Sequence, residues 1–147
     1  MTLRRQAQPS RRAETAPHHH PLPDSGTFLT VRRDGQVLFG RIRLARDFFA
    51  RLRGLLLTGP MQADDGLLLS PCSQVHTIGM TYPIDLIFLD RSGRVLRCLS
   101  DVRPYRAVRA PGAFYTLEVA AGRVKRLGVM PGQMLNWTPA QTSGGSR

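Results

Sequence analysis

The chain has 147 residues, of which 41% are hydrophobic and 21% charged, and this length and composition predict one globular domain. No stretch approaches the roughly 18 consecutive apolar residues that a membrane-spanning helix needs, so we expect no membrane span. The net charge of +11 comes from 21 lysine and arginine residues against 10 acidic ones, and Lys125 is the single lysine.

The arginines are scattered along the chain, and such a surface attracts polyanions without selecting among them. Specific recognition of nucleic acid would need aromatic residues interleaved with the charges, or a recognition helix. Neither pattern is present, so we expect no specific nucleic-acid function. The N-terminal arginines are not followed by an apolar stretch, which argues against a secretory signal and favours a cytoplasmic protein.

The two cysteines, Cys72 and Cys98, are too few for a disulfide framework or a structural zinc site. In a cytoplasmic protein both are expected to be thiols. The sequence therefore predicts no metal and no cofactor.

Composition divides the chain into three parts. Residues 1–26 are rich in Arg, Pro, Ala and His without apolar periodicity, which predicts a disordered tail. Residues 27–137 are expected to form the folded β domain, and residues 138–147 a second flexible end. A domain of this size can bury one compact core.

The first expected element is a hairpin over 27–44. Two alternating apolar and polar segments flank Asp34-Gly35, a strong two-residue turn signal because both positions accept φ > 0. The alternation is imperfect around Gly40, which is a candidate β-bulge.

The next segment, 47–56, is the best helix candidate. Asp47 can cap its first turn, and Phe48, Leu52 and Leu55 recur at helical spacing. Gly54 weakens the interior of this helix.

The remainder of the domain reads as strands. We expect a strand at 66–69, a hairpin whose arms are 83–89 and 94–102, a strand at 113–120, and a last strand after the turn at Pro131-Gly132. Strands and helices do not alternate, which argues against a parallel doubly wound sheet. The predicted fold is mainly β, a compact sandwich or half-barrel of about seven short strands with one packed α-helix.

Two carboxylates stand in strongly apolar strands. Within 84–89, alternation places Asp85 on one face with Ile87, while Glu118 lies opposite Leu117 and Val119 in its own strand. A buried carboxylate must find donors or be protonated. We therefore expect His76, Thr77, Arg51 or glycine-turn amides to supply hydrogen bonds. Either these contacts fix turns and the helix, or the two acids share a ligand pocket.

Cys72 and His76 are the one pair that resembles a nucleophile and a base. Their surroundings argue against a helix that would bring them to one face, and no nucleophile-elbow motif is present. The simpler interpretation is a buried thiol and a hydrogen-bonded imidazole.

Five segments in order resemble the DUF192 family of small bacterial and archaeal proteins of uncharacterised function. They are RLRGLLL, DDGLLL, PCSQVHTIGMTYPIDLIFLD, TLEVAAG and PGQML. The resemblance implies a compact, mainly β fold and no established activity or cofactor. The family carries Gly-Asp where this chain has Gly132-Gln133, so any role of that acid is absent or altered. The family positions carry over as Arg51, Gly54, His76, Thr77, Met80, Pro83, Asp85, Glu118 and Gly122.

These observations favour a monomeric, non-enzymatic binding or accessory module that recognises a small ligand or a protein partner at a polar site. No catalytic residue is expected, and the alternative is a small enzyme that uses Cys72 and His76, with or without a metal. The ligand-binding candidates are Arg51, His76, Thr77, Met80, Asp85 and Glu118.

Overall fold

The computed structural model describes residues 22–46 and 60–141, and this part of the chain contains nine strands and one short helix. The predicted mainly β fold is confirmed. The strands are β1 (Phe28–Arg33), β2 (Gln36–Ala45), β3 (Asp65–Leu69), β4 (Gln74–His76), β5 (Ile84–Leu89), β6 (Val95–Val102), β7 (Ala107–Arg109), β8 (Tyr115–Ala120) and β9 (Asn136–Pro139), and the helix is α2 (Arg123–Leu127).

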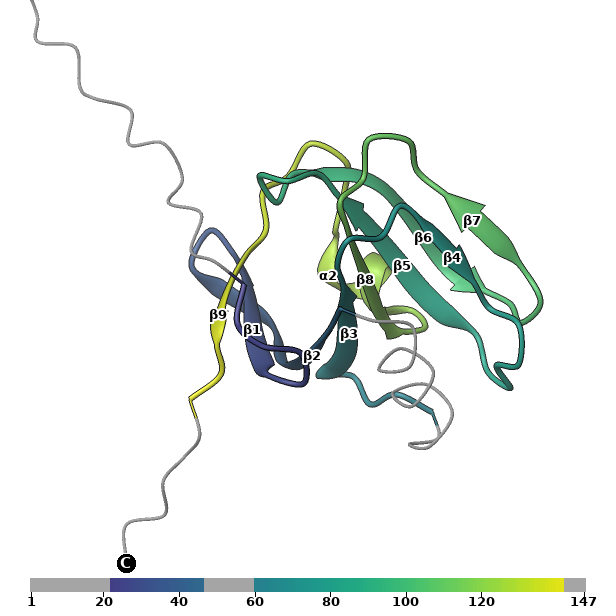
Figure 1. Ribbon diagram of the computed structural model, residues 1–147, viewed down its shortest axis with the longest axis horizontal. Helices are drawn as coiled ribbons and strands as arrows, with labels where there is room; N and C mark the ends of the chain where they lie inside the picture. The colour runs from purple at the N-terminus through teal and green to yellow at the C-terminus, as the bar shows by residue number, and fades with distance from the viewer. Residues whose placement is uncertain (1–21, 47–59, 142–147) are drawn as a thin grey trace, which may run out of the picture.

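Seven strands form one sheet in the order β6-β5-β8-β3-β2-β1-β9 (Figure 1). Neighbours run antiparallel except β2 and β3, which are parallel. Strands β4 and β7 pair as a separate antiparallel sheet. Residues from β1 and from β5 share one core cluster, so the large sheet curves around that cluster. Among the described strands β6 and β9 remain as edges, so this sheet does not close into a barrel.

The predicted first hairpin is confirmed. Asp34 and Gly35 connect β1 to β2 with φ angles of 50° and 78°, the left-handed region that a tight two-residue turn requires. The register between β1 and β2 shifts between Leu29 and Val31, in the region of Gly40. The candidate bulge therefore coincides with an irregular pairing.

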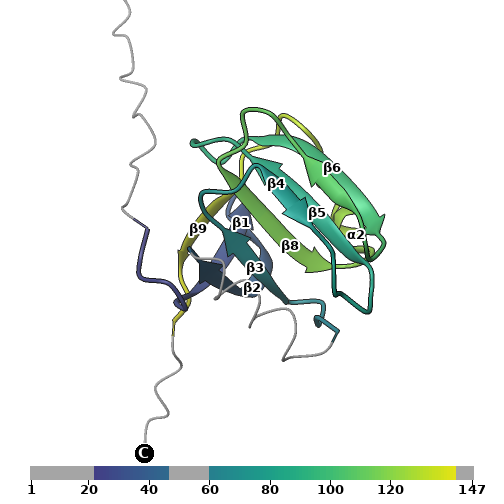
Figure 2. The same ribbon diagram turned by 45° about the vertical axis from the view of Figure 1, so that its right-hand side comes forward.

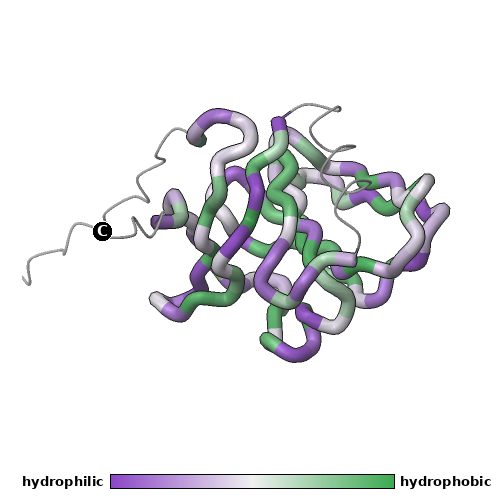
Figure 3. The backbone as a smooth tube through the Cα atoms, turned by 90° about the horizontal axis from the view of Figure 1, so that it is seen from below, coloured by the Kyte–Doolittle hydropathy of each residue, from purple (hydrophilic) through white to green (hydrophobic). Residues whose placement is uncertain are grey.

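Strand β5 separates two hydrophobic clusters because both of its faces are buried. Ile87 and Leu89 belong to the first cluster, whereas Ile84, Leu86 and Phe88 belong to the second. This division is the alternation that the sequence predicts. Along the backbone, hydrophobic and hydrophilic segments alternate through the middle of the molecule (Figure 3).

The small β4–β7 sheet packs on the second cluster. Val75 of β4 is buried there beside residues of β5, and Figure 2 shows β4 lying next to β5. Ala45 at the end of β2 and Met61 also pack on this cluster. The residues on either side of segment 47–59 therefore pack on the same cluster.

Strands β3 and β8 approach closely at Gly66. A Cβ atom at this position would collide with the carbonyl oxygen of Glu118 and with the side chain of Ile42. Glycine is therefore required where the motif DDGLLL enters the sheet.

Four elements differ from the sequence expectations. The three-residue strands β4 and β7 and the five-residue helix α2 were not predicted. Strand β9 continues to Pro139, two residues past the expected end of the domain. The helix predicted at 47–56 lies outside the described residues.

Candidate functional site

The buried carboxylate of Asp85 is bound by three backbone amides. Its Oδ1 accepts hydrogen bonds from the N–H groups of Asp101 (2.9 Å) and Gly122 (3.1 Å), and its Oδ2 accepts from Val124 (2.8 Å). Gly122 begins α2 without a side-chain cap, so Asp85 performs the capping role from a different element. The expected glycine-turn amide is confirmed as a donor to this acid, whereas neither His76 nor Thr77, the other two described candidates, donates to Asp85.

Thr77 joins the loop after β4 to the loop between β6 and β7. Its hydroxyl donates to the carbonyl oxygen of Arg103 (2.8 Å) and accepts from the N–H of Arg106 (2.8 Å). Its backbone N–H donates to the Arg106 carbonyl (2.8 Å), and its carbonyl accepts from Tyr105 (3.0 Å). All the hydrogen-bonding groups of this buried residue therefore serve to connect two loops.

Glu118 and Met80 lie on the side of the second cluster. Glu118 is paired with Leu86, a member of that cluster, and Met80 is itself a member. Burial raises the pKa of the Tyr82 hydroxyl, and the charge of Glu118 raises it further. Both site candidates are thus part of an apolar layer.

The sheet separates Asp85 from Glu118. In the β5–β8 pairing, Asp85 lies opposite Val119, which belongs to the first cluster, whereas Glu118 lies opposite Leu86 of the second. Paired residues share a face and adjacent residues alternate, so the two carboxylates project from opposite faces. The structure does not bring them into one pocket.

Cys72 and His76 make different contacts. The buried Cys72 Sγ donates to the carbonyl oxygen of Gln74 at 3.2 Å. His76 is exposed on β4, where its Nε2 lies 3.2 Å from the Gln74 side-chain nitrogen. Within residues 22–46 and 60–141, no three His, Cys, Asp or Glu residues are placed to hold a metal ion.

Cys98 is partly buried on β6 beside the first cluster. Burial, and to a smaller extent the charge of Asp85, raise the pKa of its thiol to about 11. A thiol in this environment is a poor nucleophile at neutral pH.

Two exposed apolar side chains lie in adjacent turns, and neither was among the residues predicted from the sequence. Ile78 is 68% exposed and precedes Gly79 (φ 84°) in a turn that the Met80 N–H closes onto the Thr77 carbonyl (3.3 Å). Tyr105 is 73% exposed and has a φ of 60°, which is uncommon for an aromatic residue. The sequence signals that could have indicated these two turns were Thr77-Ile78-Gly79 and Pro104-Tyr105.

We call residues 77–80 and 103–106 together the double-turn tip. The two turns lie side by side at the lower right of Figure 1, where the β4–β5 and β6–β7 connections meet (Figures 1 and 2). Arg103 and Arg106 are exposed within the tip, and His76 is exposed directly before it. Neither of these two guanidinium groups makes an ion pair or hydrogen bond with the described residues.

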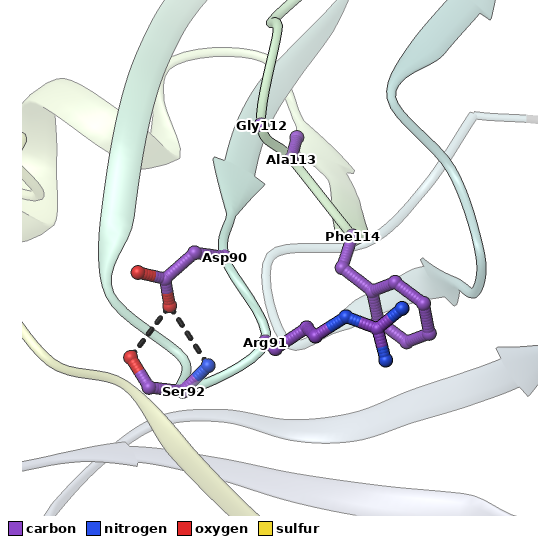
Figure 4. Close-up of a pocket in the computed structure, with 6 residues that line it drawn as sticks. All are labelled: Asp90, Arg91, Ser92, Gly112, Ala113 and Phe114. Atoms are coloured by element: carbon purple, nitrogen blue, oxygen red, sulfur yellow. Dashed lines mark hydrogen bonds between the residues drawn. The ribbon is translucent and has the colours of Figure 1, made fainter.

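A shallow pocket of about 480 Å³ lies at the opposite end of β5 and is lined by Asp90, Arg91, Ser92, Gly112, Ala113 and Phe114 (Figure 4). The Arg91 guanidinium stacks on the Phe114 ring, 4.1 Å from its centroid. Asp90 Oδ1 accepts from the Ser92 hydroxyl (2.6 Å) and from the N–H groups of Ser92 and Arg94. These contacts shape the β5–β6 turn.

Gln133 stabilises the end of α2. Its Oε1 accepts from the Met130 N–H (3.0 Å) and from Arg33 Nη1 (3.1 Å), and its Nε2 donates to the Gly128 carbonyl (3.2 Å). Arg33 also donates to the Leu127 carbonyl (2.9 Å). The side-chain amide of Gln133 therefore acts both as an acceptor and as a donor at this helix end.

Two further motif positions, Arg51 and Gly54, lie outside the described residues. In the described part of the chain, no helix has the length and apolar character needed to cross a membrane.

Comparison with known families gives one match over most of the chain. Residues 29–137 match the model of the DUF192 family, described as "Uncharacterized ACR". A UPF0127 protein of Thermococcus sibiricus is 34% identical over 114 residues, which are 74% of this chain and 73% of the relative. The UPF0127 protein TK1120 of Thermococcus kodakarensis is 30% identical over 113 residues, 73% and 71% of the two chains.

Two solved structures share the fold. A Novosphingobium aromaticivorans protein of unknown function superposes with a TM-score of 0.66 at 24% identity, over 88% of this chain and all of its own. A Sinorhizobium meliloti protein described as a "putative transcription regulator" superposes with a TM-score of 0.65 at 25% identity, over 78% of this chain and 98% of that one.

Proposed function

The chain belongs to the DUF192 family, and we propose that it is a non-enzymatic binding or accessory module that recognises its partner through the double-turn tip and His76. Exposure of the candidate residues supports this proposal. Among the five in the described part of the chain, Thr77, Met80, Asp85 and Glu118 are 5% exposed or less, whereas His76 is exposed. In this proposal the four buried residues form the scaffold.

The composition of the tip suits recognition. Tyrosine and arginine are the residues most often found at energetic centres of interfaces, and Tyr105, Arg103 and Arg106 occur within four consecutive positions. The hydrogen bonds of Thr77 hold both turns before any partner arrives. A rigid surface loses less conformational entropy on binding.

The enzyme alternative has less support. A nucleophile–base pair requires the thiol and the imidazole within hydrogen-bonding distance. In the described part of the chain, Cys72 donates to the Gln74 carbonyl and His76 lies on an exposed strand face. We therefore place this alternative second.

A photocrosslinking experiment tests the proposed surface. The benzophenone amino acid p-benzoylphenylalanine replaces Tyr105 in one variant and Met130 in the control, because Met130 is 61% exposed on a different turn. In cells that express the full chain, we expect covalent adducts with a protein or a lipid from position 105 that position 130 does not form. Identical adduct patterns from both positions would contradict a binding role for the tip.

A further inference from the structure

We propose that the partner of the double-turn tip is the surface of an anionic lipid bilayer, into which Ile78 and Tyr105 insert. This inference rests on the proposed function and specifies the partner of the same surface. Both side chains lie in adjacent turns, and they are 68% and 73% exposed.

The charges around the tip complement anionic headgroups. Arg103 and Arg106 lie within the two turns, and the exposed Arg109 ends β7, the strand that follows the tip. Asp101 is the exposed acid directly before the tip in the described part of the chain, so Arg103, Arg106 and Arg109 outnumber it. Basic residues beside an anionic membrane are attracted within about one Debye length of its surface.

The two apolar residues favour a bilayer over other polyanions. A nucleic acid or an acidic polypeptide would neutralise the arginines, but phosphates and carboxylates give the branched side chain of Ile78 nothing to pack against. The interfacial region of a bilayer accepts a protruding aliphatic group without a preformed pocket, and it suits the amphipathic ring of tyrosine. One surface therefore accommodates both kinds of side chain at the tip.

The fold holds the insertion geometry in place. Thr77 connects the two turns by four hydrogen bonds of 2.8–3.0 Å to Arg103, Tyr105 and Arg106. Tyr105 keeps a left-handed backbone conformation (φ 60°), which is unfavourable for an aromatic residue, while its side chain is 73% exposed. With only two inserted side chains, binding is expected to be weak and reversible.

Co-sedimentation of the full chain with vesicles tests the proposal. Vesicles of equal parts phosphatidylcholine and phosphatidylglycerol should bind the protein at low salt, and vesicles of phosphatidylcholine alone should not. The double variant Ile78→Ser/Tyr105→Ser should reduce the partition coefficient at least about tenfold. Arg103→Gln/Arg106→Gln should reduce it about 30-fold, since each arginine contributes about fivefold near an anionic surface.

Matched controls separate the tip from the general positive charge, to which arginines near the N-terminus also contribute. Met130→Ser removes a comparably exposed apolar side chain, and Lys125→Gln/Arg126→Gln removes two exposed charges from α2. The Met130 variant should bind as the wild type does, and the α2 variant should bind much more tightly than Arg103→Gln/Arg106→Gln. Melting temperatures close to that of the wild type establish that each variant is folded.

Three outcomes overturn the proposal. Wild-type binding by Ile78→Ser/Tyr105→Ser would mean electrostatic adsorption without insertion. Equal losses from the tip and α2 charge variants would mean attraction without a defined surface. If the protein does not bind anionic vesicles but forms protein adducts from position 105, the bilayer is not its partner, and the proposed function still holds.

Discussion

Asp85 shows how one buried acid can connect three parts of a small domain. Its carboxylate satisfies a β6 amide at Asp101 and two amides at the start of α2, those of Gly122 and Val124. All three N–H groups would otherwise be buried or left at a helix terminus without an acceptor. The family motif at this position therefore has a structural explanation that needs no ligand.

Asp85→Asn should lower the free energy of unfolding by about 2–4 kcal/mol. The single carbonyl oxygen of asparagine can serve the two amides at Oδ1 or the Val124 amide at Oδ2, and its NH₂ group then faces a backbone donor. Urea denaturation measures the change. Asp101→Asn is the control, because that residue is exposed and asparagine tolerates its φ of 53°, so a change within about 0.5 kcal/mol is expected. Equal stabilities of the two variants would contradict this role of Asp85.

Cys98 should resist alkylation in the folded protein. With a pKa of about 11, about one thiol in a thousand is ionised at pH 8, so iodoacetamide should react at least about a hundredfold more slowly than with a free thiol. Because the folded state retains the proton, this residue stabilises the fold below the ordinary thiol pKa, and that contribution is lost as the pH rises towards 11. Peptide mass spectrometry measures labelling with and without urea. Rapid labelling in native buffer would show that the thiol is not shielded.

At the scale of elements, the β4–β7 sheet and its loops depend on the Thr77 hydroxyl. Thr77→Val keeps the shape of the side chain but leaves the Arg106 N–H without its hydroxyl acceptor and the Arg103 carbonyl without its donor. We expect a loss of about 2 kcal/mol in unfolding free energy, measured by urea denaturation. Thr81→Val is the matched control because Thr81 is exposed. The same loss in both variants would indicate a general effect of removing a hydroxyl.

The contribution of sequence signals differs from element to element. The β1–β2 hairpin and the two faces of β5 were predictable because Asp34-Gly35 and strict alternation are local signals. Helix α2 was not predictable, because its capping residue is Asp85, which lies 39 residues before Val124 in the sequence. The three-residue strands β4 and β7 are too short to show a period and depend on tertiary pairing.

The same distinction applies to the candidate site. The burial of Asp85 and Glu118 could be predicted from their apolar neighbours, but their separation on opposite faces required the β5–β8 register. The double-turn tip was missed because Ile78 and Tyr105 come from loops that only the contacts of Thr77 bring together. An exposed aliphatic residue also has no distinctive pattern in a single sequence.

At the scale of the whole molecule, charge repulsion should be measurable. With a net charge of +11, the folded chain holds its arginines closer together than the unfolded chain does. Raising NaCl from low concentration to about 0.3 M screens this repulsion and should raise the melting temperature by a few degrees. Arg103→Gln/Arg106→Gln should show a smaller increase. A melting temperature that falls with NaCl would indicate that attractive charge pairs dominate.

The pairing of β1 with β9 has a consequence for synthesis of the protein. Leu29 lies opposite Pro139 and Val31 opposite Trp137, so the strand at the start of the domain completes its hydrogen bonding with the strand at its end. In a nascent chain, one edge of β1 therefore remains unpaired until the ribosome has translated the residues of β9. Ribosome stalling before that point should leave the growing polypeptide sensitive to protease, and release of the complete chain should end that sensitivity.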